Sequence, residues 1–304
     1  MRLPGLSTQA PKEYRSTTAS GRVTHMMETP SVFIRYPVEH YNKIGNDAIK
    51  KAREKEGGYF ESLKIPRDLK PLNLSTETDV VNAAQMYVIY PVVEILDILY
   101  KGKFDVFGEY AATMGQEWEK EEEEEESEDE DNDYNDNDND DGDDDNGTGE
   151  IPEEKKMSLR YDLVFKTKTG KIIAIIESKR RGQIRRGDFD NAIIPFEDMD
   201  KPSKVSAKIQ EAREIRGGKN LLLANGLSFT KQVSAYAASG SCEYVALFNW
   251  EHLILFRFID VNIQKRSVGK RAFITWVDEG NGDFIRKALL GWMIEAFASR
   301  FKKD

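Results

Sequence analysis

The spacing of hydrophobic residues changes along the chain, and the clearest helical spacing covers residues 76–100. Apolar residues recur there at intervals of three and four, which predicts a long, buried helix. Thr76 and Asp79 have the spacing of a capping box at its start. Pro91 lies within the apolar run, so we expect the helix to bend or end near this residue.

After residue 158 the pattern becomes typical of β-structure. Apolar segments at 159–167 and 171–179 flank Thr169-Gly170, which predicts a hairpin with a two-residue turn. The other predicted elements are helices at 41–62 (broken at Gly57-Gly58), 203–215, 228–238 (with Ser228 as N-cap) and 284–301, and strands at 104–110, 221–223, 244–248, 253–258 and 271–277. This mixture of strands and helices predicts an α/β fold with a central mixed sheet.

Charge is distributed unevenly along the chain. The window 117–150 holds 21 acidic residues and one basic residue, so its net charge is −20. The whole chain has a net charge of −10, so the residues outside this window carry +10. Like charges repel, and Asn, Asp and Gly favour coil, so we expect a disordered acidic insertion. Two other interpretations are a tether for basic protein partners such as histones, and an internal mimic of nucleic acid that shields a basic groove.

Composition excludes several classes of protein and suggests an organisation into segments. No apolar run approaches the ~18 residues of a membrane span, and the first residues have no apolar signal segment. A single cysteine, Cys242, excludes intramolecular disulfides and Cys-based zinc sites. We therefore expect a protein of the nucleus or cytoplasm, with a disordered basic tail (1–30), a helical extension (31–75) and a main domain (76–304) interrupted by the acidic loop.

The candidate chemistry lies on the predicted hairpin. A two-residue turn would place Asp162 directly opposite Glu177 on one face, and alternation along the strand adds Lys179 to that face. Two facing carboxylates repel each other, and a divalent metal ion removes that repulsion. A nearby lysine can then orient or deprotonate a metal-associated water molecule, or stabilise charge on a phosphate.

These residues resemble a known family. Asp162 followed by Glu177-Ser178-Lys179, on apolar strands, is similar to the motif of the PD-(D/E)XK nuclease superfamily. Gln232 and Tyr236, four residues apart on a predicted helix, resemble the QxxxY motif of its RecB-like branch, with Gln210 as a rival for the glutamine.

The resemblance implies a restriction-endonuclease-like fold and Mg²⁺- or Mn²⁺-dependent hydrolysis of phosphodiester bonds, with DNA as the expected partner. By the same resemblance, Asp162, Glu177 and the backbone carbonyl of Ser178 would hold the metal, and Lys179 would position the attacking water. Gln232 and Tyr236 would orient the substrate or the lysine. The first helix of such folds often carries a further acid, for which Glu77, Asp79 and Glu94 are candidates, and Glu94 is preferred.

A basic run follows the proposed metal centre at once, and it contains Arg180, Arg181, Arg185 and Arg186. Arginines next to a metal centre favour contact with a phosphate backbone. A solvated loop and a nuclear-import signal are the other interpretations of this run. Two functional alternatives also stay open: a nuclease-like fold that binds nucleic acid or protein without cleavage, and an interaction protein that acts through its acidic tract.

Overall fold

The computed structural model describes residues 27–58, 72–108, 161–215, 220–262, 264–265, 267–278 and 285–302. The acidic window 117–150 and most of the predicted basic tail lie outside the described residues.

An eight-stranded sheet forms the centre of the fold, with the strand order β2-β3-β4-β6-β7-β8-β1-β5. Its strands are β1 (Val32–Arg35), β2 (Phe104–Gly108), β3 (Leu163–Thr167), β4 (Ile172–Ser178), β5 (Ile193–Ile194), β6 (Tyr244–Phe248), β7 (His252–Phe258) and β8 (Arg271–Asp278). The pairs β4–β6, β8–β1 and β1–β5 are parallel and the others are antiparallel. The predicted α/β class with a mixed sheet is confirmed.

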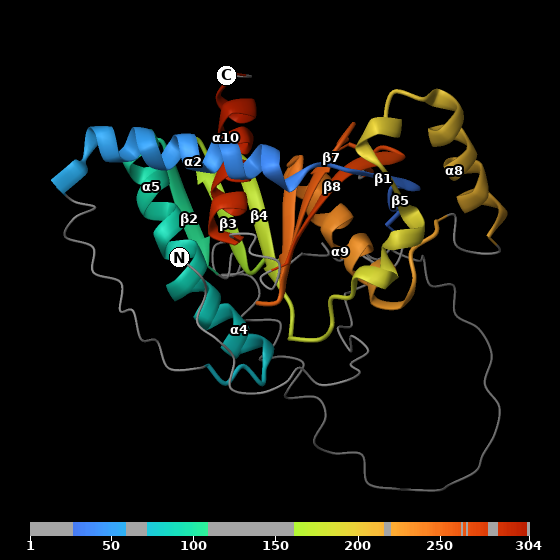
Figure 1. Cartoon of the computed structure of the whole chain (residues 1–304), viewed down its shortest axis with the longest axis horizontal. Helices are drawn as coiled ribbons and strands as arrows, with labels where there is room; N and C mark the ends of the chain where they lie inside the picture. The colour runs from blue at the N-terminus through green and yellow to red at the C-terminus, as the bar shows by residue number, and fades with distance from the viewer. Residues whose placement is uncertain are drawn as a thin grey trace, which may run out of the picture.

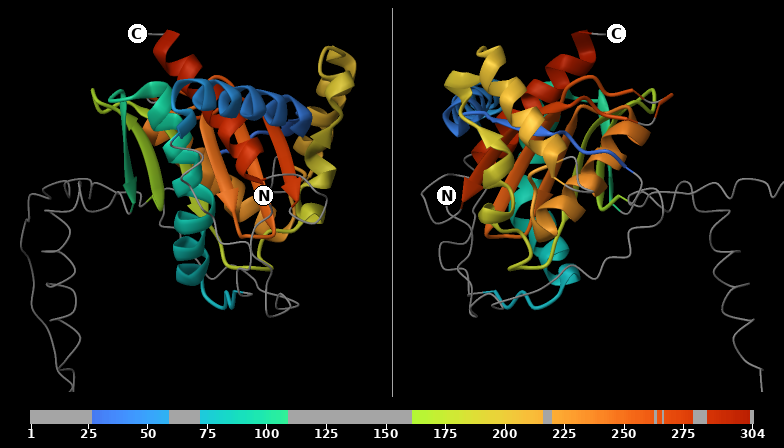
Figure 2. Two further views of the ribbon diagram at one scale, coloured as in Figure 1. Left: turned by 60° about the vertical axis from the view of Figure 1, so that its left-hand side comes forward. Right: turned by 90° about the vertical axis from the view of Figure 1, so that its right-hand side faces the viewer.

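Helices cover both faces of this sheet (Figure 1). On one face, α10 (Ile285–Lys302) packs against the strands and α2 (Val38–Lys55) crosses over α10. On the other face, α9 (Ala224–Gly240) contacts β4 and β6. α8 (Pro202–Glu214) packs against β1 on the same face as α10, where Val205 clusters with Val32 and Ile34. The turned views in Figure 2 show the helices on either side of the strands.

The long helix predicted at 76–100 is present but changes its winding. It consists of α4 (Glu77–Ala84), a π-helical turn (Gln85–Ile89) and α5 (Tyr90–Tyr100), and the capping box of Thr76 and Asp79 is confirmed. A proline ring clashes with the carbonyl four residues before it in a regular α-helix. The helix does not end at Pro91, and the wider π-helical turn directly before this residue accommodates its ring.

By length and hydropathy, the same helix, Glu77–Tyr100, is the one among the described residues that would suit a membrane span. Its inward side chains, among them Val80, Val92 and Leu96, are buried in the main hydrophobic core. Of its most apolar stretch, 33% is buried inside the structure.

The β3–β4 hairpin has the predicted register, but it reaches that register by a different route. Thr167 pairs with Lys171 through a 2.9 Å hydrogen bond, so three residues and not two form the turn. Gly170 occupies the left-handed region of that turn with φ of +82°. A β-bulge at Ile173 then shifts the pairing back, so that Leu163 lies opposite Ile176. The predicted turn length was wrong, and the bulge compensates for it.

Residues 31–58 belong to the same folded unit as the main domain, whereas the sequence predicted a separate helical extension at 31–75. β1 lies between β8 and β5 inside the sheet. Residues 27–30, predicted as disordered tail, include the buried Met27 and Thr29. α2 lies against α10 so closely that a Cβ on Gly291 would come within 1.9 Å of the Tyr41 carbonyl oxygen. Glycine is therefore required at this helix crossing.

The remaining elements match their predicted ranges within a few residues, with two exceptions. α9 begins at Ala224, four residues before the predicted N-cap Ser228. The predicted strand 221–223 is coil, and the N–H of Leu223 donates to the Asp188 carbonyl oxygen (2.9 Å). These apolar residues are therefore buried or held by the loop after β4 without joining the sheet.

Candidate metal centre

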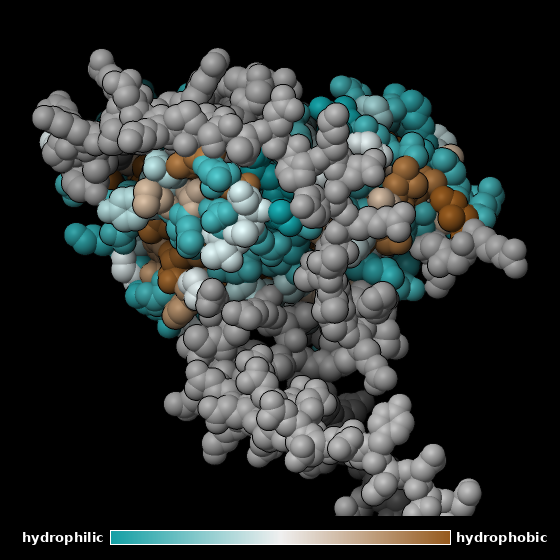
Figure 3. Space-filling model, turned by 90° about the horizontal axis from the view of Figure 1, so that it is seen from below, coloured by the Kyte–Doolittle hydropathy of each residue, from teal (hydrophilic) through white to brown (hydrophobic). Residues whose placement is uncertain are grey.

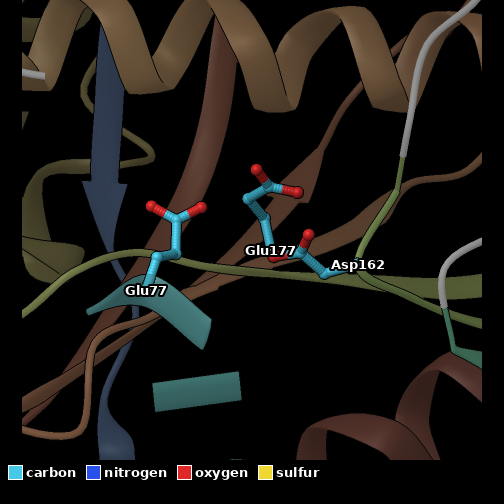
Figure 4. Close-up of side chains that lie close together, drawn as sticks. All are labelled: Glu77, Asp162 and Glu177. Carbon is cyan, nitrogen blue, oxygen red and sulfur yellow. The ribbon is translucent and has the colours of Figure 1, made fainter. Parts of the chain in front are cut away.

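Three carboxylates meet at the C-terminal end of β4. They come from Glu77 in the first turn of α4, Asp162 just before β3, and Glu177 near the end of β4 (Figure 4). One oxygen of each lies within 4.8 Å of the others. This spacing would suit a shared divalent cation, whose oxygen ligands lie about 2–2.6 Å from the ion.

Backbone groups of the strand end hold two of these carboxylates in place. The N–H of Ser178 donates to Asp162 Oδ2 at 2.7 Å. The backbone N–H of Arg180 donates to the Glu77 carboxylate. Asp162 and Glu77 thus accept hydrogen bonds from the backbone of Ser178, in β4, and of Arg180, in the loop after it. These bonds to the backbone fix the positions of the two carboxylates.

Lys179 is buried among these acids. Its Nζ lies 2.7 Å from Glu177 Oε1 and 3.9 Å from Glu77 Oε1, and its side chain is 0% exposed. The ammonium group also lies 5.5 Å from the centre of the Phe229 ring of α9. A buried ammonium is stable only with such partners, so the carboxylates and the lysine depend on one another.

The electrostatics of the cluster follow from burial and from the excess of acid. Burial raises the pKa of Glu177 to about 7, although the Lys179 ammonium opposes this shift. Burial also raises the pKa of Glu77. For Lys179, burial lowers the pKa, but the carboxylates of Glu177 and Glu77 outweigh it and the pKa is raised above its ordinary value. The lysine is therefore a cation at neutral pH.

Gln232 and Tyr236 of α9 complete the surroundings of Glu177. Gln232 Nε2 donates to Glu177 Oε1 (2.7 Å) and to the Tyr236 hydroxyl oxygen (2.6 Å). The Tyr236 hydroxyl is also hydrogen-bonded to the Glu177 carboxylate, and burial raises its pKa well above the ordinary value. The ring of Tyr161 lies edge-on to Tyr236, with centroids 4.8 Å apart. The contact of Tyr161 with Tyr236 was not predicted from the sequence; the place of Tyr161 directly before Asp162 was the available signal.

One oxygen of the cluster is unsatisfied. Glu177 Oε2 is buried and has no hydrogen-bond partner among the described residues. Such an atom is costly to bury, and a bound cation would satisfy it. The donor set of three carboxylates also matches the oxygen ligands that Mg²⁺ and Mn²⁺ prefer. These residues therefore fit a divalent cation.

The rival candidates for the site lie elsewhere, which corrects the preference for Glu94. Glu77 supplies the helix carboxylate, whereas Glu94 hydrogen-bonds with Tyr90 on α5, outside the cluster. Asp79 is used by the capping box. Gln210 of α8 is bound to Glu214 (3.3 Å), so Gln232 is the glutamine at the site.

The four arginines after β4 do not share one environment. Arg181 is buried and paired with Glu251 at 3.0 Å, so it is not placed for the predicted phosphate contact. Arg180 and Arg185 are partly exposed, and Arg186 is exposed beside Asp278 (3.6 Å). Three of the four predicted contacts are therefore accessible at the edge that bears the carboxylates.

Figure 3 views this edge of the sheet from below, with hydrophilic surface in its middle and hydrophobic patches to either side. Among the described residues, the large hydrophobic side chains with the highest exposure are Met86, Tyr90, Ile215 and Leu223. Met86 and Tyr90 lie on the helix that begins with Glu77.

The chain was compared with protein-family models, curated proteins and solved structures, and no significant match was found in any of the three comparisons.

Proposed function

We propose that this chain is a metal-dependent nuclease of the PD-(D/E)XK type, which hydrolyses phosphodiester bonds in DNA. The observation that supports the proposal is the meeting of Glu77, Asp162 and Glu177 with the buried Lys179 at one end of the hairpin. A restriction-endonuclease-like arrangement is part of the same proposal, since the mixed sheet carries these residues on consecutive strands and on an adjoining helix.

The three carboxylates, together with the backbone carbonyl of Ser178, would hold Mg²⁺. When bound, the ion would supply positive charge to stabilise the phosphate during attack by water. The chain's own part is to hold Glu77, Asp162 and Glu177 ready, through the backbone N–H groups of the β4 end. Such preorganisation avoids a reorganisation cost at the moment of reaction.

Lys179 lies against Glu177, a proposed metal ligand, and its charge would act on a ligand held by that carboxylate. One of its N–H bonds is directed at Glu177 Oε1 (2.7 Å), which leaves further N–H bonds for a water molecule or a phosphate oxygen. Since the lysine is a cation at neutral pH, it orients and stabilises rather than removes a proton. Gln232, itself bound to Tyr236, donates to Glu177 and so holds this carboxylate beside Lys179.

The test is a cleavage assay on single- and double-stranded DNA with Mg²⁺ or Mn²⁺, with RNA as a comparison. We expect Glu177→Gln and Lys179→Met each to lower the rate at least about 10²-fold, as for the loss of a preorganised electrostatic contact. Glu77→Gln should lower the rate as well. Glu94→Gln is the matched control, because Glu94 lies on the same long helix but outside the cluster.

Two results would contradict the proposal. Cleavage that is equally fast in Glu177→Gln would assign the activity to another site or to a contaminant. Binding of DNA without cleavage under every metal condition would instead favour a nuclease-like fold with a binding role.

A further inference from the structure

A cavity of about 430 Å³ lies at the other end of the β3–β4 hairpin, beside the C-terminal end of α9. Its lining includes the cationic Lys166, Lys171 and Arg300, and none of the residues that line it is acidic. The three carboxylates of the metal centre do not take part in this lining. The cavity therefore extends from the turn to Tyr161, beside the metal centre, but its lining has the opposite charge.

The cations of this cavity are fixed by the fold to different degrees. Lys166 on β3 is only 8% exposed, and its Nζ lies 5.5 Å from the centre of the Phe107 ring. Arg300 of α10 donates from Nη2 to the Ser241 carbonyl oxygen (3.0 Å) and from Nε to that of Ile172 (3.0 Å). Lys171 is exposed at the turn. The Arg300 guanidinium is thus held by two carbonyl oxygens, whereas the printed contact of the Lys166 ammonium is with the Phe107 ring on β2.

The size and the other side chains of the cavity narrow the class of ligand. A volume of about 430 Å³ is within the range of small-molecule sites, and a free phosphate group would fill only a small part of it. Tyr161 and Ile172 supply apolar surface, and Ser239 and Ser241 supply hydroxyl groups. A ligand with a phosphate group and an aromatic or apolar remainder matches this lining.

We infer that this cavity binds a nucleoside-monophosphate-like ligand, with its phosphate on Lys166, Lys171 and Arg300 and its remainder against Tyr161 and Ile172. Three cationic residues in one lining that contains no acidic residue favour a dianionic phosphate. The Tyr161 ring also contacts Tyr236 of the metal centre. A ligand in the cavity would therefore touch the aromatic neighbour of the residue that holds Glu177.

The test measures binding rather than cleavage. The full chain is titrated with AMP by isothermal calorimetry in EDTA, with adenosine and inorganic phosphate as comparison probes. We expect AMP to bind more tightly than either comparison probe. Lys166→Met and Lys171→Met should each weaken AMP binding by about tenfold, as expected for the loss of one charged contact.

Lys168→Met is the matched control, because Lys168 lies on the same turn but is paired with Asp105 outside the lining. Glu177→Gln should leave AMP binding unchanged, which separates this site from the metal centre. Equal AMP affinity in Lys171→Met, Lys168→Met and the unaltered chain would overturn the inference. Binding of adenosine or of inorganic phosphate as tight as that of AMP would also overturn it. If Lys166→Met fails to fold, the test rests on the AMP affinity of Lys171→Met, whose substituted side chain is exposed.

Discussion

The two ends of the β3–β4 hairpin carry opposite charge and differ in how that charge is held. At the end of β4, three acids surround one buried lysine. At the turn, three basic side chains line a cavity whose lining contains no acid. At the acidic end Glu177 and Lys179 are buried and hydrogen-bonded, whereas Lys171 at the basic end is exposed. Buried charges need fixed partners, so the acidic end should be the more sensitive to substitution.

The largest expected difference between the two ends concerns a single lysine. Lys179→Ala should lower the free energy of unfolding by about 3–5 kcal/mol, because it leaves a buried acid without its cation. Lys171→Ala, at the exposed turn, should change it by about 0.5 kcal/mol or less. Urea denaturation in EDTA measures both values. Similar losses for the two variants would contradict the comparison.

Divalent cations should stabilise the acidic end alone. At a concentration of about 100 times the dissociation constant, Mg²⁺ or Mn²⁺ should add about 2.7 kcal/mol, seen as a rise in the melting temperature. Asp162→Asn and Glu177→Gln should remove the rise, since each deletes one ligand charge. Lys166→Met, in the cavity, should retain it. A rise that persists in Glu177→Gln would place the ion elsewhere.

The hydrogen bond between Gln232 and Tyr236 should contribute a smaller amount to the free energy of unfolding. Tyr236→Phe removes the hydroxyl oxygen that accepts from Gln232, and we expect a loss of about 1 kcal/mol in the free energy of unfolding. A double-mutant cycle with Gln232→Leu measures the coupling. Strictly additive losses would show that the two side chains act independently.

The smallest expected effect has the opposite sign. Glu77→Gln removes one of three repelling acids, and its side chain is 41% exposed. We expect the metal-free protein to gain up to about 0.5 kcal/mol of stability, with exposure limiting the gain. The same variant should weaken the effect of Mg²⁺. Thermal unfolding without and with Mg²⁺ measures the stability of the metal-free protein and the stabilisation by the ion. Glu94→Gln should change neither quantity.

Much of the site could be predicted from local periodicity. Alternation along β4 placed Glu177 and Lys179 on one face, and the four-residue spacing placed Gln232 and Tyr236 on one face of α9. The structure brings these two faces together through the 2.7 Å contact of Gln232 with Glu177. The register of the hairpin was right although the turn was wrong, because the bulge at Ile173 restored it. A bulge of this kind has no clear pattern in the sequence.

The choice of the helix acid could not be made from the sequence. Glu77 and Glu94 lie on the same long helix, and both are partly exposed. Only the position of the α4 N-terminus beside the end of β4 selects Glu77. β1 was missed for a related reason, because the short run Val32–Arg35 shows no period of its own and becomes a strand only between β8 and β5.

The sequence by itself determined the α/β class, the capped helix at 76–100, the hairpin, and the pairing of Asp162 with Glu177 and Lys179. These properties follow from spacing along the chain, which local geometry converts into faces of helices and strands. Tertiary structure decided which acid joins the cluster, that Arg181 is buried against Glu251, and that a basic cavity lies behind the turn. Each of these depends on contacts between residues far apart in the chain, and such contacts are set by packing rather than by any repeat in the sequence.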